Sequence, residues 1–150
     1  GDGTDGADTI NNFVQADDII DFTTSAVAGA DGTATDLQTA DLSGGGDVAT
    51  ADGLIVVDSG ATGGAVTLNA AGVADLIDGT SSTDALTLND GDEAFYVAVD
   101  NGSDTAIALV DDGNGNGDNS IDDGEVTVIA TLVGVGDAST LTAANFADFA

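Results

Sequence analysis

The chain has 150 residues, 28 acidic side chains and no Lys, Arg or His, so its formal net charge is −28. Without cationic side chains it has no means of gripping phosphate groups, which excludes nucleic-acid binding and direct adsorption to anionic membranes. The absence of Cys, His and Lys also excludes disulfides, thiolate zinc sites and catalysis by thiols, imidazoles or Schiff bases. Because the chain contains no Met, we expect residue 1 to be a processed end or a fragment boundary.

The first third of the chain is rich in small and polar residues. Residues 1–22 start with a Gly/Asp stretch and continue with two apolar runs, 10–14 and 19–22, which we predict to be short strands. We expect this segment to be either an extended arm or the remnant of a β-roll. Residues 28–53 are of low complexity, so we expect a long irregular loop there.

The middle of the chain alternates between strand and helix patterns. The continuous apolar run 54–57 predicts a strand buried on both faces, and weaker patterns predict strands over 65–68 and 84–88. Asn69 is a suitable N-cap for a short helix over 70–77, because its side-chain oxygen can accept a hydrogen bond from a free backbone N–H.

The strongest strand signals lie in the last third of the chain. Residues 94–99 and 104–110 are joined by an Asn-Gly turn and predict a hairpin, and 126–133 predicts a third long strand rich in β-branched residues. Thr142 is placed to cap a short final helix, in which Phe146 and Phe149 lie three residues apart on one face. We therefore expect a mainly β chain with one or two short helices.

The excess of negative charge favours an external cation. Nothing in the chain can pair with 28 carboxylates, and like charges destabilise a compact state. Asp-rich and Gly-rich turns supply the oxygen ligands that Ca²⁺ prefers. We therefore expect residues 1–150 to form a single calcium-binding domain, a calcium-stabilised β-sandwich or β-roll-like sheet, outside the cell where Ca²⁺ is plentiful.

The clearest candidate metal site is the loop 111–125, which is similar to calcium loops of the EF-hand type. Such loops have oxygen ligands at alternate positions, an apolar residue at position 8 and a bidentate Glu at position 12. One alignment gives the ligands Asn114, Asn116, Asp118, Ser120, Asp122 and Glu125, with Ile121 at position 8. A second alignment gives the ligands Asp112, Asn114, Asn116, Asp118 and Asp123. Both alignments stay open.

Two further acidic turns are weaker candidates for calcium. The stretch 3–11 is similar to the nonapeptide of calcium β-rolls and would offer Asp5 and Asp8. The turn 89–93 would offer Asp90 and Asp92. Two other acidic clusters lie at the ends of predicted strands. For the first, Asp17, Asp18 and Asp21, we favour exposure to solvent without a metal. The second is Asp100 with Asp104.

Both ends of the chain resemble RTX-type proteins exported by type I secretion. The resemblance rests on GTDGADTINNFVQADDIIDF at the start, and on ALVDDGNGNGDNSIDDGEVTVIATLVGVGDASTLTAANF near the end. It implies export without a cleaved N-terminal signal, an uncleaved C-terminal export region and folding on meeting external Ca²⁺. The chain departs from the family in its near-absence of repeats and its long Ala/Gly/Thr middle.

These features favour a non-enzymatic protein of the cell exterior. We expect an extracellular calcium-binding structural or adhesive protein that assembles with copies of itself into a filament, matrix or surface layer. The alternative is a calcium-dependent folding and export module cut from a larger secreted RTX enzyme or adhesin. A lectin-like domain that binds cell-surface polysaccharide is a third reading, although the chain has only five Phe and one Tyr.

Overall fold

The computed structural model describes six stretches of the chain, and every structural statement below concerns only these stretches. They are residues 7–22, 36–40, 53–57, 66–77, 94–111 and 121–147. Of residues 36–40, 53–57, 94 and 95 only the backbone is described.

The centre of the fold is a six-stranded mixed sheet with the strand order β1-β7-β6-β5-β4-β3. Its strands are β1 (Asp8–Asn11), β3 (Asp36–Ala40), β4 (Gly53–Val57), β5 (Ala94–Asp100), β6 (Asp104–Asp111) and β7 (Val126–Val133). Strands β5, β6 and β7 are antiparallel neighbours, whereas β3, β4 and β5, and also β1 and β7, pair in parallel. A separate two-stranded parallel sheet joins β2 (Ile20–Asp21) to β8 (Phe146–Ala147).

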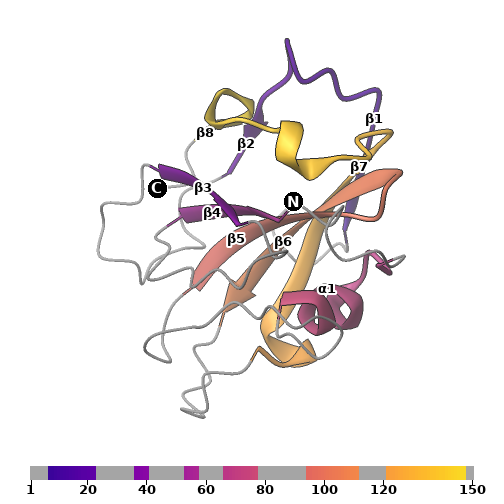
Figure 1. Ribbon diagram of the computed structural model, residues 1–150, viewed down its shortest axis with the longest axis vertical. Coiled ribbons are helices and arrows are strands. Elements are labelled where there is room, and N and C mark those ends of the chain that lie inside the picture. The colour runs from indigo at the N-terminus through magenta and orange to yellow at the C-terminus, as the bar shows by residue number, and fades with distance from the viewer. Residues whose placement is uncertain are drawn as a thin grey trace.

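One α-helix and three short 3-10 helices complete the described elements. These are α1 (Ala70–Ile77), η2 (Asp123–Glu125), η3 (Ala138–Thr140) and η4 (Ala143–Asn145). Figure 1 shows α1 on one side of the sheet and the C-terminal turns, in yellow, on the other. The sheet therefore forms a middle layer with two covered faces.

The β5–β6 hairpin, which the sequence predicts, is closed by an Asn-Gly turn. The Asn101 side-chain oxygen accepts hydrogen bonds from the N–H groups of Ser103 and Asp104, at 3.0 and 2.9 Å. Gly102 has a φ of +83°, which a glycine adopts without the steric cost that a Cβ would bring. The turn thus sets the register in which Asp100 pairs with Thr105.

Alternate residues of the central strands serve two separate cores. On β5, Val97 and Val99 pack against the helix side, whereas Tyr96 and Ala98 face the C-terminal turns. These side chains are all at most 4% exposed, as expected of strands covered on both faces. Full burial of an aliphatic side chain such as Ile107 contributes roughly 1.5–3 kcal/mol to folding.

The predicted helix and its cap are confirmed. The Asn69 side-chain oxygen accepts a hydrogen bond from Gly72 N at 2.8 Å, which satisfies one of the unpaired donors at the start of α1. Val73, Leu76 and Ile77 are buried on one face of the helix. Gly72 is required because a Cβ there would lie 2.1 Å from the carbonyl oxygen of Thr67.

The second face of the sheet is covered by both ends of the described chain. Phe22 stacks on Tyr96 with ring centroids 4.2 Å apart, and its ring lies 6.0 Å from that of Phe146. Val135, Ala138 and Leu141 join this core from the turns after β7. Phe22, Tyr96 and Phe146 therefore lie together on the face opposite α1.

The N-terminal segment, defined here as residues 7–22, is paired within the chain. Strand β1 pairs with β7, in a register that aligns Asp8 with Ala130, and β2 pairs with β8. Asn12, with a φ of +59°, turns the backbone between the two strands, a conformation that Asn tolerates better than most residues. Residues 7–22 therefore lie against other strands of their own chain.

Three expectations need correction. Residues 36–40 form β3, although 28–53 was expected to be irregular, because parallel pairing with β4 satisfies their backbone. Residues 66–68 are not a strand, since Asn69 N donates to the oxygen of Thr67 in a turn. The final helix is one 3-10 turn, after which Phe146 enters β8.

The expected mainly β chain with a short helix is confirmed. The described elements form a mixed sheet with a helix on one face and a small second sheet on the other. The predicted strand over 84–88 lies outside the described residues. Within the described part of the chain, none of the helices has the length and apolar character needed to cross a bilayer.

Candidate metal centre

The candidate calcium loop leaves the sheet at one end of the β6–β7 pair. Val110 of β6 is aligned with Val126 of β7, so the loop 111–125 starts and finishes at neighbouring backbone positions. Residues 112–120 lie outside the described part of the chain, and this includes Asp112, Asn114, Asn116, Asp118 and Ser120. The described part of the loop consists of Asp111 and residues 121–125.

The last residues of the loop form a compact turn stabilised by two reciprocal hydrogen bonds. Asp122 N donates to Glu125 Oε2 at 2.8 Å, and Glu125 N donates to the backbone oxygen of Asp122 at 2.9 Å. These bonds close η2 and turn the Glu125 side chain back towards the start of the turn. Asp122 and Asp123 are exposed to solvent, whereas Glu125 is buried.

Apolar contacts fix this turn to the core on the helix side. Ile121 and Val126 flank the turn and are only 2% and 4% exposed. Both belong to the same core as Val73, Leu76 and Ile77 of α1. The position of the turn is therefore determined by packing on each side of Glu125.

Glu125 itself is the unusual feature of the site. Its side chain is 4% exposed, and the only hydrogen bond to its carboxylate from the described residues comes from Asp122 N. A buried carboxylate normally has several hydrogen bonds or a paired cation. No Lys, Arg or His exists anywhere in the sequence to provide that cation.

The other predicted metal ligands do not gather around this site within the described residues. Asp8 is exposed at the start of β1. Asp5, Asp90 and Asp92 lie outside the described part of the chain. Across the described stretches, no three acidic side chains come close enough together to hold a metal ion.

Asp100 and Asp104, which sequence analysis grouped as an acidic pair, have structural roles. Asp100 is 3% exposed, and its two oxygens accept hydrogen bonds from Gly102 N at 2.9 Å and Ala138 N at 3.0 Å. Asp104 Oδ1 accepts a hydrogen bond from Gly134 N at 2.8 Å. Both aspartates therefore join the β5–β6 turn to the segment after β7.

Asn145 has a structural role that sequence reasoning missed. It is 1% exposed, and its amide nitrogen donates to the backbone oxygens of Gln15 and Asp18 at 2.6 and 3.2 Å. Its side-chain oxygen accepts a hydrogen bond from Thr142 N at 3.0 Å. Asn145 thereby connects the N-terminal segment to the C-terminal turns. Its place in LTAANF, at the end of the segment that resembles RTX-type proteins, was the available signal.

Comparison with known proteins identifies no relative of this chain. No protein-family model matches the chain, and searches of the curated proteins and of the solved structures return no match.

Proposed function

We propose that this chain is an extracellular calcium-binding structural protein whose fold is completed by Ca²⁺ in the loop 111–125 and whose copies assemble with one another. The single observation that carries the proposal is the buried carboxylate of Glu125 at the end of a loop rich in oxygen ligands. Burying a charged carboxylate without compensation is costly. Since no side chain in the protein is cationic, we infer that an external metal ion supplies the compensating charge.

The geometry of the turn favours one of the two alignments of the calcium loop. In the alignment that starts at Asn114, Ile121 occupies the apolar position and Glu125 the twelfth position, and both are buried. In the alignment that starts at Asp112, the twelfth residue is Asp123, which is exposed at the start of η2. The first alignment therefore fits the observed burial better. It assigns Glu125 as the carboxylate that closes the site.

Calcium suits this loop better than other common metals. The chain offers oxygen ligands only, since it has neither His nor Cys, and oxygen-only sites favour Ca²⁺ or Mg²⁺ over zinc or copper. A long Gly/Asn loop adapts to the six to eight ligands of Ca²⁺, whereas Mg²⁺ requires a tighter octahedral arrangement. External Ca²⁺ would also reduce the repulsion among the acidic side chains.

Self-assembly is supported by the edges of the six-stranded sheet. Strands β1 and β3 stand at the two ends of the described strand order, and an edge strand can pair with a strand of another molecule. Strands β1 and β2 each pair with a strand of their own chain. We therefore propose that copies meet at sheet edges, with Ca²⁺ between their carboxylates.

Imaging of the native protein tests this function. Negative-stain images in millimolar Ca²⁺ should show filaments or sheets, and these should disperse after chelation while monovalent salt is kept high to screen long-range repulsion. Filaments that survive chelation would contradict bridging by metal. A strictly monomeric protein in millimolar Ca²⁺ would contradict the structural function as a whole.

The packing of the two chain ends favours a second candidate function. The two segments that resemble RTX-type proteins contact each other through β1–β7, β2–β8 and Asn145, so they form one substructure. Such a substructure would suit a folding and export module at the end of a larger secreted protein. The intact mass of the native protein separates the alternatives, because the module predicts a mass far above that of 150 residues.

A further inference from the structure

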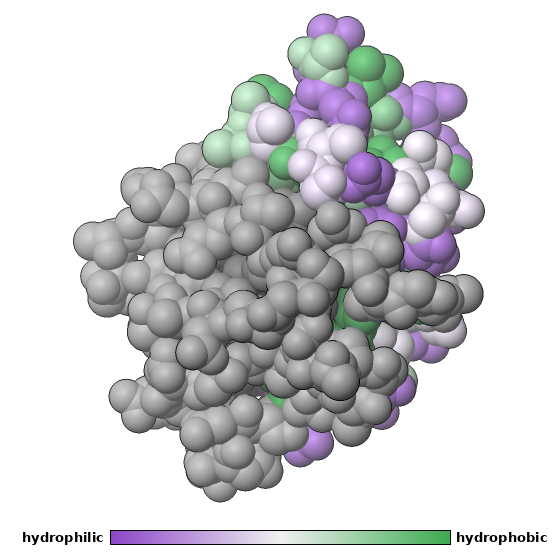
Figure 2. All heavy atoms as spheres, in the orientation of Figure 1, coloured by the Kyte–Doolittle hydropathy of each residue, from purple (hydrophilic) through white to green (hydrophobic). Residues whose placement is uncertain are grey.

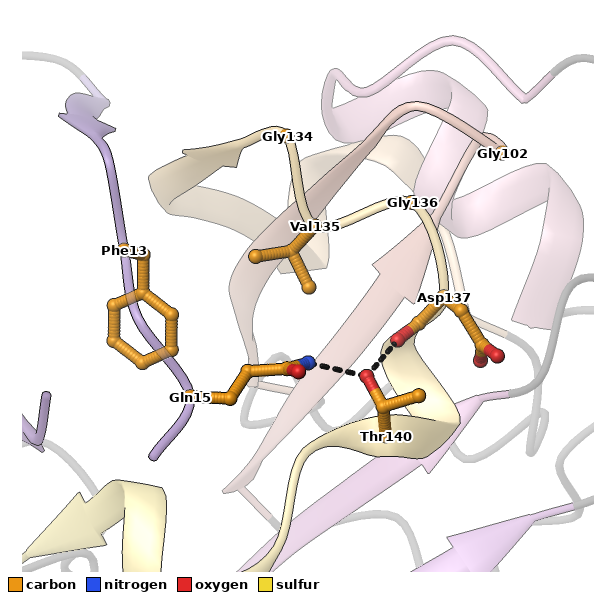
Figure 3. Close-up of a pocket in the computed structure, with 8 residues that line it drawn as sticks. All are labelled: Phe13, Gln15, Gly102, Gly134, Val135, Gly136, Asp137 and Thr140. Atoms are coloured by element: carbon orange, nitrogen blue, oxygen red, sulfur yellow. Dashed lines mark hydrogen bonds between the residues drawn. The ribbon is translucent and has the colours of Figure 1, made fainter. Parts of the chain in front are cut away.

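A cavity of about 430 Å³ lies between the N-terminal segment and the turns that follow β7. Figure 3 shows Phe13 and Gln15 on one side of it, Thr140 and Asp137 on the opposite side, and Val135 between them. Figure 2 shows hydrophilic and hydrophobic residues mixed in the part of the surface where Figure 1 places these segments. The volume is within the range of small-molecule sites, roughly 300–1,000 Å³.

Polar groups that both donate and accept hydrogen bonds line the cavity. The Gln15 amide donates to the Thr140 hydroxyl, which in turn donates to the backbone oxygen of Asp137 at 2.6 Å. The Asp137 Oδ1 atom accepts hydrogen bonds from Ser139 N and Ser139 Oγ, at 3.0 and 2.6 Å. Because these bonds hold the amide, hydroxyl and carboxylate in place, the groups are positioned before any ligand arrives.

An apolar surface and exposed backbone complete the wall. The ring of Phe13 is half-buried and borders the cavity, and Val135, which is 6% exposed, also lines it. Gly136 packs against the β5–β6 turn so closely that a Cβ would lie 2.7 Å from the oxygen of Gly102. The glycines keep this part of the wall free of side chains, so a ligand can approach the backbone.

The charge of the protein limits the class of ligand. A net charge of −28, with Asp137 among the lining residues, opposes an anionic ligand. A metal ion is disfavoured because Asp137 is the only acidic residue among the described residues that line the cavity. A neutral molecule with many hydroxyl groups matches the mixed donors and acceptors. Its apolar face would match the Phe13 ring.

We propose that this cavity binds a neutral sugar residue, with the apolar face of the sugar on the ring of Phe13 and its hydroxyl groups at Gln15, Asp137 and Thr140. The site lies at the boundary between the N-terminal segment and the C-terminal turns, so a bound sugar holds the two together. This inference does not depend on self-assembly. A monomer in which the N-terminal segment is docked presents the same cavity.

The test is a titration in saturating Ca²⁺ followed by amide NMR. The probes are the methyl glycosides of glucose, galactose and mannose, with galacturonic acid as the anionic comparison and spermidine as the cationic one. At least one neutral glycoside should shift the amide signals of Gly102, Gly134 and Gly136, and galacturonic acid should not. Shifts caused by spermidine and by none of the glycosides would overturn the proposal in favour of a cation site.

Matched variants separate the site from non-specific binding. Phe13→Leu keeps an apolar side chain but removes the ring face, and it should weaken glycoside binding about tenfold. Val14→Ala changes the neighbouring residue, which is 48% exposed and does not line the cavity, and it should leave binding unchanged. Thr140→Val provides a second test, because it removes the hydroxyl but keeps the shape. Equal glycoside affinity in all these variants would overturn the proposal.

Discussion

Two buried carboxylates of this protein have different surroundings. Asp100 is 3% exposed, and backbone N–H groups of two separate segments donate to its two oxygens. Glu125 is 4% exposed, and one backbone N–H from its own turn donates to it. The first carboxylate lies at a junction between turns, and the second lies at the end of an Asp/Asn-rich loop. We propose that the difference separates an acid that maintains the fold from one that binds Ca²⁺.

The comparison shows how a chain without cationic side chains accommodates buried negative charge. Backbone N–H groups can stabilise a carboxylate where several of them converge, as they do at Asp100. At Glu125 the described residues provide only one such N–H group. We propose that Ca²⁺ provides the remaining stabilisation there. The predictions below test whether the two acids differ in this way.

The largest expected effect is that of removing Ca²⁺. In chelator, far-ultraviolet circular dichroism should show loss of β structure, because the free energy of metal binding contributes directly to folding. Adding Ca²⁺ should restore the spectrum, and Mg²⁺ at the same concentration should restore it poorly. Sodium chloride at about 1 M, where the Debye length is roughly 3 Å, should not replace Ca²⁺. An unchanged spectrum in chelator at low salt would contradict the proposed role of the metal.

The next effect concerns Asp100. Asp100→Ala leaves Gly102 N and Ala138 N without this acceptor and should lower the free energy of unfolding by about 3 kcal/mol. Denaturant unfolding in saturating Ca²⁺ measures this loss. Asp100→Asn keeps one acceptor oxygen and should lose less. If Asp100→Ala changed the affinity for Ca²⁺ as strongly as it changed stability, the distinction between the two acids would fail.

Asn145 provides a neutral counterpart to the two acids. Asn145→Ala removes the side-chain bonds to the backbone of Gln15, Asp18 and Thr142, and it should cost about 2 kcal/mol of unfolding free energy. Amide hydrogen exchange should increase first in the N-terminal segment, because the lost bonds connect that segment to the C-terminal turns. Equal increases of exchange throughout the chain would contradict this local role.

The smallest effect is a shift in the titration of Tyr96, the only Tyr in a chain without Trp. Burial raises the pKa of Tyr96 above its usual value of 10.0, since desolvation disfavours the phenolate. The folded state therefore holds this proton to higher pH than the unfolded state, so stability falls as the pH rises above about 10. The ultraviolet absorbance of the phenolate measures the titration. In chelator the pKa should return towards 10.0, because the core that includes Tyr96 should unfold with the rest of the domain.

The parts of the fold that were predictable from sequence depend on local patterns. Alternating side chains and an Asn-Gly turn predicted the β5–β6 hairpin, and β-branched residues predicted β7. The Asn69 cap predicted α1 because capping involves only residues three positions apart. These elements provide most of the helix-side core.

The unpredicted parts depend on partners that are distant in the sequence. Strand β3 has little apolar character of its own and is defined by its parallel pairing with β4. The three-residue spacing of Phe146 and Phe149 suggested a helix, but Phe146 pairs with Ile20 in β8 and packs near Phe22. No local sequence pattern predicts that residues 7–22 lie beside residues 130–147.

The same limit applies to the candidate site. Sequence spacing identified the loop 111–125 and its two alignments, but it gave no reason to prefer one of them. The burial of Ile121 and Glu125, with Asp123 exposed, depends on how the turn packs near α1. The structural role of Asp100 could not be predicted from the sequence either, because its partner Ala138 is distant in the sequence.

The most direct test of calcium binding at Glu125 is isothermal titration calorimetry of Ca²⁺ with three proteins. These are the unaltered chain, Glu125→Gln, and Asp21→Asn, which removes one negative charge from an exposed position on β2. We predict that Glu125→Gln loses the tightest binding event or weakens it by at least about tenfold, because a carboxylate ligand is replaced by an amide. Asp21→Asn should bind Ca²⁺ as the unaltered chain does. Equal affinity in the unaltered chain and in Glu125→Gln would contradict the assignment of Glu125 as a calcium ligand.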